Sequence, residues 1–237
     1  MYQTNTNSQI TLTQARQDAS TIFLAKVFNW MAIGLGITGV VAWFTASSGL
    51  AMRLVASPVF MILIVAELGM VFFLSARISK IQAGTATGLF LGYALLNGLT
   101  LSMIFLAYTS SSIASTFFIT AGMFGAMAIY GLVTKRDLSG LGSFLFMGLV
   151  GIIIASIVNI FLKSSSLYWV ISLLGVFIFV GLTAYDVQKI KKIGEDGIME
   201  QGEEMVKKGA IMGALTLYLD FINLFLMLLR FFGGSRS

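Results

Sequence analysis

The chain has 237 residues, of which 57% are hydrophobic and 11% are charged, and its net charge is +5. Soluble domains carry about 25% charged residues, so this composition excludes a water-soluble globule and predicts a membrane protein. The sequence contains no Cys and no His, which excludes disulfides, thiol nucleophiles, imidazole bases and the usual zinc sites.

Seven apolar runs follow a polar start. Residues 1–26 are rich in Thr, Asn and Gln, so we expect a polar cytoplasmic tail and no cleaved signal peptide. Each run is long enough for a membrane-spanning helix of about 20 residues. The runs are Val27–Ala46, Val59–Ala76, Thr85–Tyr108, Ile113–Val133, Leu141–Leu162, Leu167–Asp186 and Gly209–Phe232. The sequence therefore predicts an all-α polytopic membrane protein in which residues 27–237 form a single seven-helix transmembrane domain.

The basic residues predict how the spans are oriented. Lys and Arg concentrate on the cytoplasmic side of membrane proteins, and a cytoplasmic N-terminus leaves only four of the 15 outside. These four are Arg53, Lys163, Arg230 and Arg236. We therefore expect the N-terminus in the cytoplasm and the C-terminus outside, unless the last segment is re-entrant. Because the basic residues lie in short clusters between apolar runs, they predict topology and no nucleic-acid partner.

One long polar connection, residues 187–208, separates the last two spans. It carries lysines near both ends and five acids between them. The acids are Glu195, Asp196, Glu200, Glu203 and Glu204. We interpret this segment as a solvated cytoplasmic loop, with a peripheral cation site as the alternative.

Three acids lie within or at the ends of the apolar runs: Glu67, Asp186 and Asp220. An ionisable side chain at mid-membrane costs at least about 2.5 to 3.5 kcal/mol on insertion scales, so each of these acids requires an explanation. Asp220 lies about 18 Å along a helix from the preceding lysines, which places it near the middle of the bilayer. Thr216 and Asn223 share its helix face, so we expect this polar stripe to point into the bundle.

Asp186 and Asp220 belong to consecutive, antiparallel spans. The midpoint between their positions falls inside the connecting loop, so the two carboxyl groups lie at similar depth if both helices extend into that loop. Two carboxylates in a low-dielectric site repel each other, so we expect the pair to share a proton and to titrate as a unit. Arg77 is the candidate counter-charge, which would lock the second span to the sixth. A simple membrane anchor is the alternative role for Arg77.

Glu67 is surrounded in the sequence by apolar residues. One interpretation is a neutral acid hydrogen-bonded to another helix. In the other interpretation, Glu67 is an acidic binding position along an ion path, which Thr216 and Asn223 would also line. Three polar residues share one face of the third span, where we expect hydrogen bonds between helices: Tyr93, Asn97 and Thr100.

Four segments carry the features of a known family: FFLSARISKI, TAGMFGAMAIYGLVTKRDLSGLGSFLFMGLVGIIIASIVN, GLTAYDVQKIKK and GALTLYLDFINLFLMLLR. They resemble the transmembrane Bax inhibitor motif family, in particular its bacterial inner-membrane branch, and the likeness runs from about Phe28 to Phe232. The resemblance implies six helices around a central seventh. It also implies that Asp186 and Asp220 sense pH for a calcium leak, that Arg77 pairs with Asp186, and that Glu67 is the family's second-span acid.

The number of oxygen ligands that calcium prefers limits how tightly this chain could bind it. Calcium prefers six to eight oxygen ligands, whereas Asp186 and Asp220 with a few hydroxyls and amides form only a weak site, as conduction requires. No nucleotide-binding loop appears, so we expect neither a pump nor a bound cofactor. Together with these residues, the family resemblance therefore implies a pH-sensitive calcium leak channel without enzymatic activity, with calcium and protons as its ions, in a bacterial inner membrane. The sign of the pH response stays open.

Two alternatives remain. The chain could be a non-conducting regulator of other membrane proteins, because Gly84, Gly88 and Gly92 recur at every fourth position and favour close helix approach. The family resemblance implies a membrane-bound AAA protease as one such partner. The minor alternative is an intramembrane aspartyl protease. Those enzymes place Gly-x-Gly before the second aspartate, whereas Leu217 to Leu219 precede Asp220 here.

Overall fold

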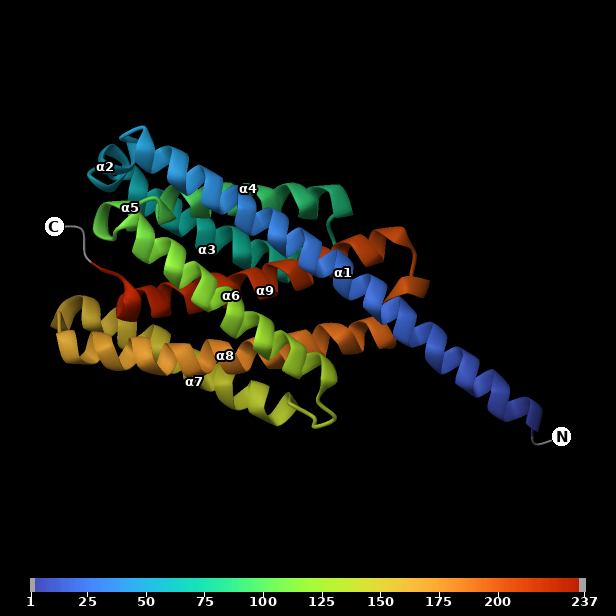
Figure 1. The fold of residues 1–237 in the computed structure, drawn as a ribbon. Helices are drawn as coiled ribbons and strands as arrows, with labels where there is room; N and C mark the ends of the chain where they lie inside the picture. Colours follow the sequence, from blue (N-terminus) through green and yellow to red (C-terminus); the bar gives the residue numbers. More distant parts are fainter. Residues whose placement is uncertain (1–2, 235–237) are drawn as a thin grey trace. The chain divides into compact units, whose positions relative to one another are not determined.

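The computed structural model describes residues 3–234, with side chains from Gln14 onward, and the described chain is helical almost throughout (Figure 1). Its helices are α1 (Gln3–Ser47), α2 (Leu50–Val55), α3 (Val59–Arg77), α4 (Ala83–Leu101), α5 (Ile104–Ala107), α6 (Ser110–Val133), α7 (Ser139–Leu162), α8 (Ser165–Glu195), the 3-10 turn η1 (Ile198–Glu200) and α9 (Glu203–Phe232). Within the described residues there is no strand, and seven helical segments are long and apolar enough to cross a membrane. The predicted all-α polytopic fold is confirmed.

The helices around the predicted loop 187–208 are longer than the apolar runs. α8 continues to Glu195 and α9 begins at Glu203, so only residues 196–202 connect them. Ion pairs between residues four apart stabilise both extensions. These pairs are Lys191–Glu195 at 3.6 Å, Lys207–Glu203 at 2.6 Å and Lys208–Glu204 at 3.0 Å. Gly197 and Gly202 turn the short connection with φ angles of 91° and 90°, which few other residues adopt.

Two further boundaries differ from the apolar runs. α1 continues as one helix back to Gln3, so residues 3–26 of the predicted polar tail extend the first span. The third span divides at Ser102 and Met103 into α4 and α5, and Tyr108 ends α5 by donating its backbone N–H to the carbonyl of Ile104.

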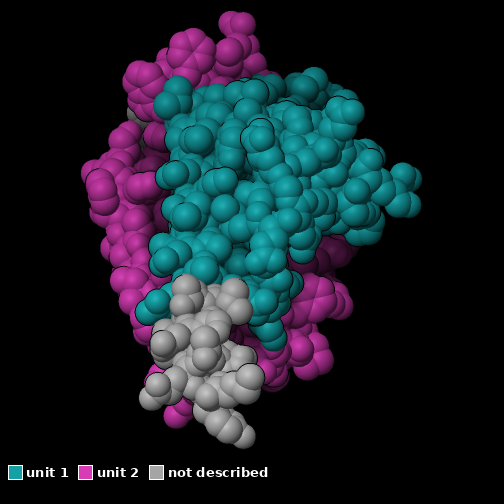
Figure 2. Space-filling view, turned by 90° about the vertical axis from the view of Figure 1, so that its right-hand side faces the viewer, with its two compact units in different colours: residues 1–42, 54–100, 189–215 teal, residues 43–53, 101–188, 216–237 magenta. Residues whose placement is uncertain are grey.

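The chain folds into two compact units, which Figure 2 colours separately. The first unit comprises Met1–Ala42, Leu54–Thr100 and Lys189–Leu215. The second comprises Trp43–Arg53, Leu101–Gln188 and Thr216–Ser237. Helices α1, α8 and α9 therefore contribute residues to both units.

In the first unit, α1 packs closely against the end of α8 and the start of α9. Phe23 and Val27 are fully buried and lie against Gly209 and Gly213 of α9. The hydroxyl of Ser20 donates to the carbonyl of Lys191 at 2.9 Å. These small residues let the helix backbones approach each other.

In the second unit, the second half of α9 packs against α6, α7 and α8. The ring of Phe221 makes edge contacts with Phe117 and Phe124 of α6, with centroids 5.4 Å and 5.5 Å apart. A buried apolar cluster completes this core, and its members are Leu145, Phe179, Leu182, Leu224, Met227 and Leu228. α9 is the most buried of the seven membrane-length helices: 67% of its most apolar window is buried, against 6% for α3. This agrees with the central place expected for the last helix.

Candidate functional site

Asp186 of α8 and Asp220 of α9 lie together in the second unit. They are buried, with 9% and 5% of their surface exposed, and their side chains are hydrogen-bonding and electrostatic neighbours. Both helices extend beyond their apolar runs into the predicted loop. This extension is the condition under which the sequence places the two carboxyl groups at similar depth. A hydrogen bond between two carboxyl groups needs a proton on at least one of them, and the predicted sharing of that proton stays a prediction.

One oxygen of this pair has no hydrogen bond. Among the described residues, Asp220 Oδ2 is buried without a partner. An unsatisfied buried acceptor costs about 1 to 3 kcal/mol, so the site favours a donor or a cation at this oxygen. No group of three or more His, Cys, Asp or Glu suited to a metal ion occurs in the part of the chain that the structure describes. Two carboxyl groups supply fewer oxygen ligands than the six to eight that a resident calcium ion prefers.

Buried residues adjoin the pair on both of its helices. Thr183 is buried one turn before Asp186, but its hydroxyl donates to the carbonyl of Phe179 in the same helix at 2.7 Å. The residues next to Asp220 on its helix are buried and mostly apolar: Leu217, Tyr218, Phe221 and Leu224. Charge on the pair is therefore held in a low-dielectric environment, where repulsion between two carboxylates is strong.

The polar stripe predicted on α9 is only partly internal. Asp220 is buried, whereas Thr216 and Asn223 remain half-exposed. The Asn223 amide donates to the carbonyl of Leu219 at 2.8 Å. Asn223 also lines a crevice of about 260 Å³ with Ser156 of α7. Its role along an ion path stays a prediction.

Glu67 anchors a second polar cluster, which lies within the first unit. Its carboxylate accepts hydrogen bonds from Thr100 Oγ1 at 2.7 Å and from Asn97 Nδ2 at 3.3 Å, and it interacts electrostatically with Tyr93. Asn97 and Thr100 are buried while Glu67 is half-buried. The predicted hydrogen bonding between helices is therefore present, and it joins α3 to α4.

Arg77 ends α3 in the first unit. It is exposed and lines a shallow, mostly apolar hollow with Phe73 and Ala76 of the same helix. Because Arg77 and Asp186 belong to different units, the lock between them stays a prediction.

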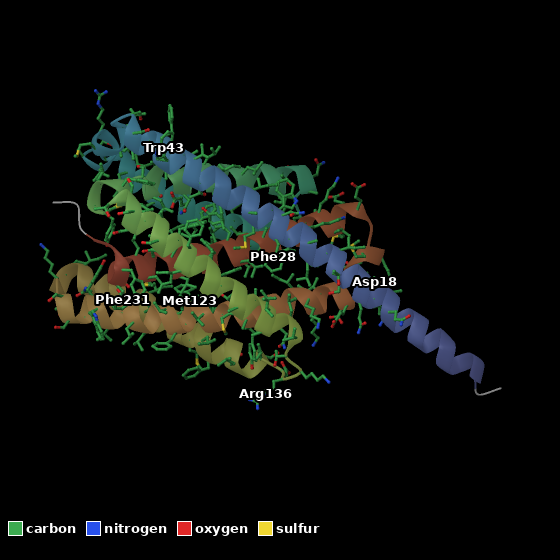
Figure 3. The ribbon with its side chains drawn as sticks, viewed as in Figure 1. Asp18, Phe28, Trp43, Met123, Arg136 and Phe231 are labelled. Atoms are coloured by element: carbon green, nitrogen blue, oxygen red, sulfur yellow. The ribbon has the colours of Figure 1, made fainter. Side chains whose placement is uncertain are left out.

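A third polar cluster, which was not predicted from the sequence, lies at the C-terminal end of α9 in the second unit. There Arg230 stacks on Tyr168 of α8, with its guanidinium carbon 4.5 Å from the ring centre. The adjacent pair, Trp169 and Phe231, makes an edge contact at 5.9 Å, and Figure 3 labels Phe231 at this end of the helix. Two features of the sequence could have indicated this cluster. Tyr168 and Trp169 are adjacent near the start of the sixth span, and Arg230 and Phe231 are adjacent at the end of the seventh.

Known proteins resemble this chain over nearly its full length. The family model for the inhibitor of apoptosis-promoting Bax1 matches residues 21–237. The inner membrane protein YbhL of Escherichia coli strain K12 is 56% identical over 216 residues, which cover 90% of this chain and 92% of that protein. A protein of Borreliella burgdorferi is 49% identical over 232 residues, which cover 96% and 99% of the two chains.

A protein of Deinococcus radiodurans is 43% identical over 231 residues, with 97% of both chains covered. The match to the family model and these identities agree with the resemblance carried by the four sequence segments. The chain is therefore an integral membrane protein that belongs to the Bax inhibitor family.

Proposed function

We propose that this chain is a pH-sensitive cation leak channel of a bacterial inner membrane, that calcium is the ion it conducts, and that a proton shared by Asp186 and Asp220 holds it closed. The observation that carries the proposal is the buried contact between these two carboxyl groups. The name of YbhL, an inner membrane protein, supports the location.

The proposed gate works through charge repulsion. With one proton on the pair, a hydrogen bond between Asp186 and Asp220 joins α8 to α9. When that proton leaves, two negative charges face each other, and at about 4 Å they repel by about 4 kcal/mol at an effective dielectric constant of about 20. This exceeds the net value of about 1 kcal/mol for a typical hydrogen bond. The helices therefore separate and the carboxylate oxygens become ligands for a cation.

The remaining site residues take roles along this route. The singly protonated pair keeps one negative charge, which Arg77 would neutralise in the closed state. Glu67 would provide a second acidic station, held by Asn97 and Thr100. Thr216 and Asn223 would add hydroxyl and amide oxygens along α9. Such scattered oxygens bind calcium weakly, which suits passage rather than storage.

Calcium flux into liposomes tests this proposal. The purified parent, Asp220→Asn and Asp186→Asn would be reconstituted without any partner and assayed between about pH 5 and 8 with a calcium-sensitive dye. The parent's flux should rise with pH, because deprotonation breaks the pair. Both Asn variants should give a low, flat profile, since an amide cannot lose this proton. Arg77→Ala should raise the basal leak.

Asp137→Asn is the matched control, because Asp137 is an exposed acid of the same unit and its loss should leave the parent's profile unchanged. If Asp220→Asn and the parent have indistinguishable pH profiles, the gate assignment is wrong.

One observation favours the regulator as a second candidate function. Gly84 and Gly88 of α4 are exposed, and a Cβ added at either would meet nothing within 4 Å among the described residues. This small-residue face can receive a helix of another membrane protein, and the family resemblance suggests a membrane-bound AAA protease. The regulator predicts no flux in pure liposomes and copurification with a partner that Gly88→Leu abolishes.

A further inference from the structure

The guanidinium of Arg230 is held in a fixed orientation at the end of α9. Its Nη1 donates to the hydroxyl of Ser172 at 3.3 Å and lies 3.7 Å from the sulfur of Met227. Its central carbon lies over the ring of Tyr168, and Ser172 is itself buried. An Arg side chain has five N–H donors, and these contacts engage only Nη1. Among the residues that the structure describes, no contact engages the donors on Nε and Nη2.

No carboxylate of the described chain neutralises this guanidinium. The salt bridges found among the described residues all lie near the connection between α8 and α9. None of the ten acids of the sequence falls within residues 101–116, 157–172 or 224–234, which supply this end of the second unit. Among the described residues, Arg230 is therefore a positioned cation without an acidic partner.

The position of Arg230 along α9 matches the level of lipid phosphates. α9 has 30 residues and is therefore about 45 Å long, which equals the thickness of a bilayer with its headgroups. Arg230 stands two residues before the end of this helix. The exposed rings of Tyr168 and Trp169 are of the type that anchors proteins at the membrane interface.

Tyr108 adds a phenol to the same place. It follows α5 and forms a hydrogen bond with Tyr168, and it interacts electrostatically with Arg230. Its ring packs against the backbone of Gly233. The chain after α9 is fixed here as well, because the Gly234 N–H donates to Ser112 Oγ at 2.9 Å and the Thr109 N–H donates to the Gly234 carbonyl at 3.1 Å.

We propose that Arg230, with Tyr168 and Tyr108, binds the phosphate group of an anionic membrane lipid at the membrane face where α9 ends. A guanidinium donates two parallel N–H bonds to a phosphate oxyanion. The phenol proton that the Tyr108–Tyr168 hydrogen bond does not use offers a further donor. The aromatic rings of Trp169 and Phe231 cover the adjoining acyl region. This lipid site is separate from the aspartate pair and does not depend on the proposed channel activity.

The competing explanation is that Arg230 only neutralises the negative end of the α9 dipole. That role predicts a loss of stability on substitution, and it predicts no dependence on lipid type. Lipid binding to the full purified chain in detergent distinguishes the two. The probes are phosphatidylglycerol, phosphatidylcholine with the same acyl chains, and inorganic phosphate, with binding followed by native mass spectrometry and by thermal shift.

The parent should bind phosphatidylglycerol saturably and in preference to phosphatidylcholine. Arg230→Gln should weaken this binding by about tenfold or more, the loss of one charge-assisted contact. Arg230→Lys should weaken it as well, because a lysine keeps the charge at the helix end but cannot form two parallel bonds; it serves as the test if Arg230→Gln does not fold. Lys163→Gln, which removes an exposed charge at the start of the α7–α8 turn, should bind within about twofold of the parent.

Four results would overturn the proposal. Equal binding of phosphatidylglycerol and phosphatidylcholine would show that the site does not prefer an anionic lipid. Parent-like binding by Arg230→Gln and Arg230→Lys would show that Arg230 does not contribute to lipid binding. An equal loss in Lys163→Gln would indicate diffuse surface charge. Displacement of phosphatidylglycerol by millimolar inorganic phosphate would indicate a site for free phosphate.

Discussion

Asp220 of α9 forms a hydrogen bond with Asp186 of α8, and both residues are buried in the second unit. Side chains in direct contact do not contribute independently to stability, so a double-mutant cycle should detect this contact. We expect the combined effect of Asp186→Asn and Asp220→Asn on the free energy of unfolding to differ from the sum of the single effects by about 0.5 to 3 kcal/mol. Thermal or denaturant unfolding of the four proteins in detergent measures the difference.

Lys163 provides the control cycle, because it is exposed and caps the end of α7 in the same unit. Asp220→Asn combined with Lys163→Gln should be additive. An equally additive result for the aspartate pair would contradict the contact itself, independently of any flux measurement.

The hydrogen bond from Thr100 to Glu67 should be important for the stability of the first unit. Thr100→Val removes the shortest hydrogen bond to this intramembrane carboxylate and should lower the free energy of unfolding by about 1 to 3 kcal/mol. Thr100→Ser keeps the hydroxyl and should recover most of the loss. Thr87→Val of the same helix removes a hydroxyl that donates to the Ala83 carbonyl one turn before it, so it should cost clearly less.

Gly131 of α6 should tolerate no side chain. A Cβ at this position would collide with the carbonyl oxygen of Ala184 in α8, and a backbone atom cannot move aside cheaply. We expect Gly131→Ala to destabilise the protein by about 1 to 3 kcal/mol, as overpacking does. Gly125→Ala of the same helix meets nothing within 4 Å and should be neutral or stabilising by up to about 1 kcal/mol. Equal stabilities of the two variants would contradict this packing of α6 on α8.

The spans could be predicted from hydropathy because each apolar run must bury its backbone polar groups in a helix within the bilayer. The positions at which the helices end could not be predicted from hydropathy. α8 and α9 continue into residues 189–195 and 203–208, where Lys–Glu pairs and not apolar side chains stabilise the helix. The break at Ser102 and Met103 was also missed, because the residues on both sides of it are apolar.

The aspartate pair could be predicted because two acids on consecutive antiparallel spans have their relative depth set by the length of the connection. The cluster of Arg230 and Tyr168 could not be predicted in the same way. A basic or aromatic residue at a span end is common at the membrane interface, so neither residue stands out alone. Their contact depends on the register and rotation of α8 against α9, which the sequence pattern does not specify.

Tyr108 should make the protein sensitive to high pH. Burial, with the neighbouring Tyr168, raises the pKa of the Tyr108 phenol above its ordinary value of 10.0, and the opposing effect of Arg230 is smaller. The folded protein therefore keeps this proton at a pH where the unfolded chain has lost it. The stabilisation is fully present below about pH 10 and is lost as pH rises through the higher folded pKa.

The parent's unfolding temperature should therefore fall more steeply above about pH 10 than that of Tyr108→Phe, which has no phenol to titrate. Other groups that titrate in this range are common to both proteins, so the difference between the two slopes isolates Tyr108. Ser112→Ala removes a hydroxyl beside the same turn but no titratable phenol, so it should keep the parent's slope. Parallel slopes for the parent and Tyr108→Phe would show that the phenol is solvated and not buried beside Tyr168.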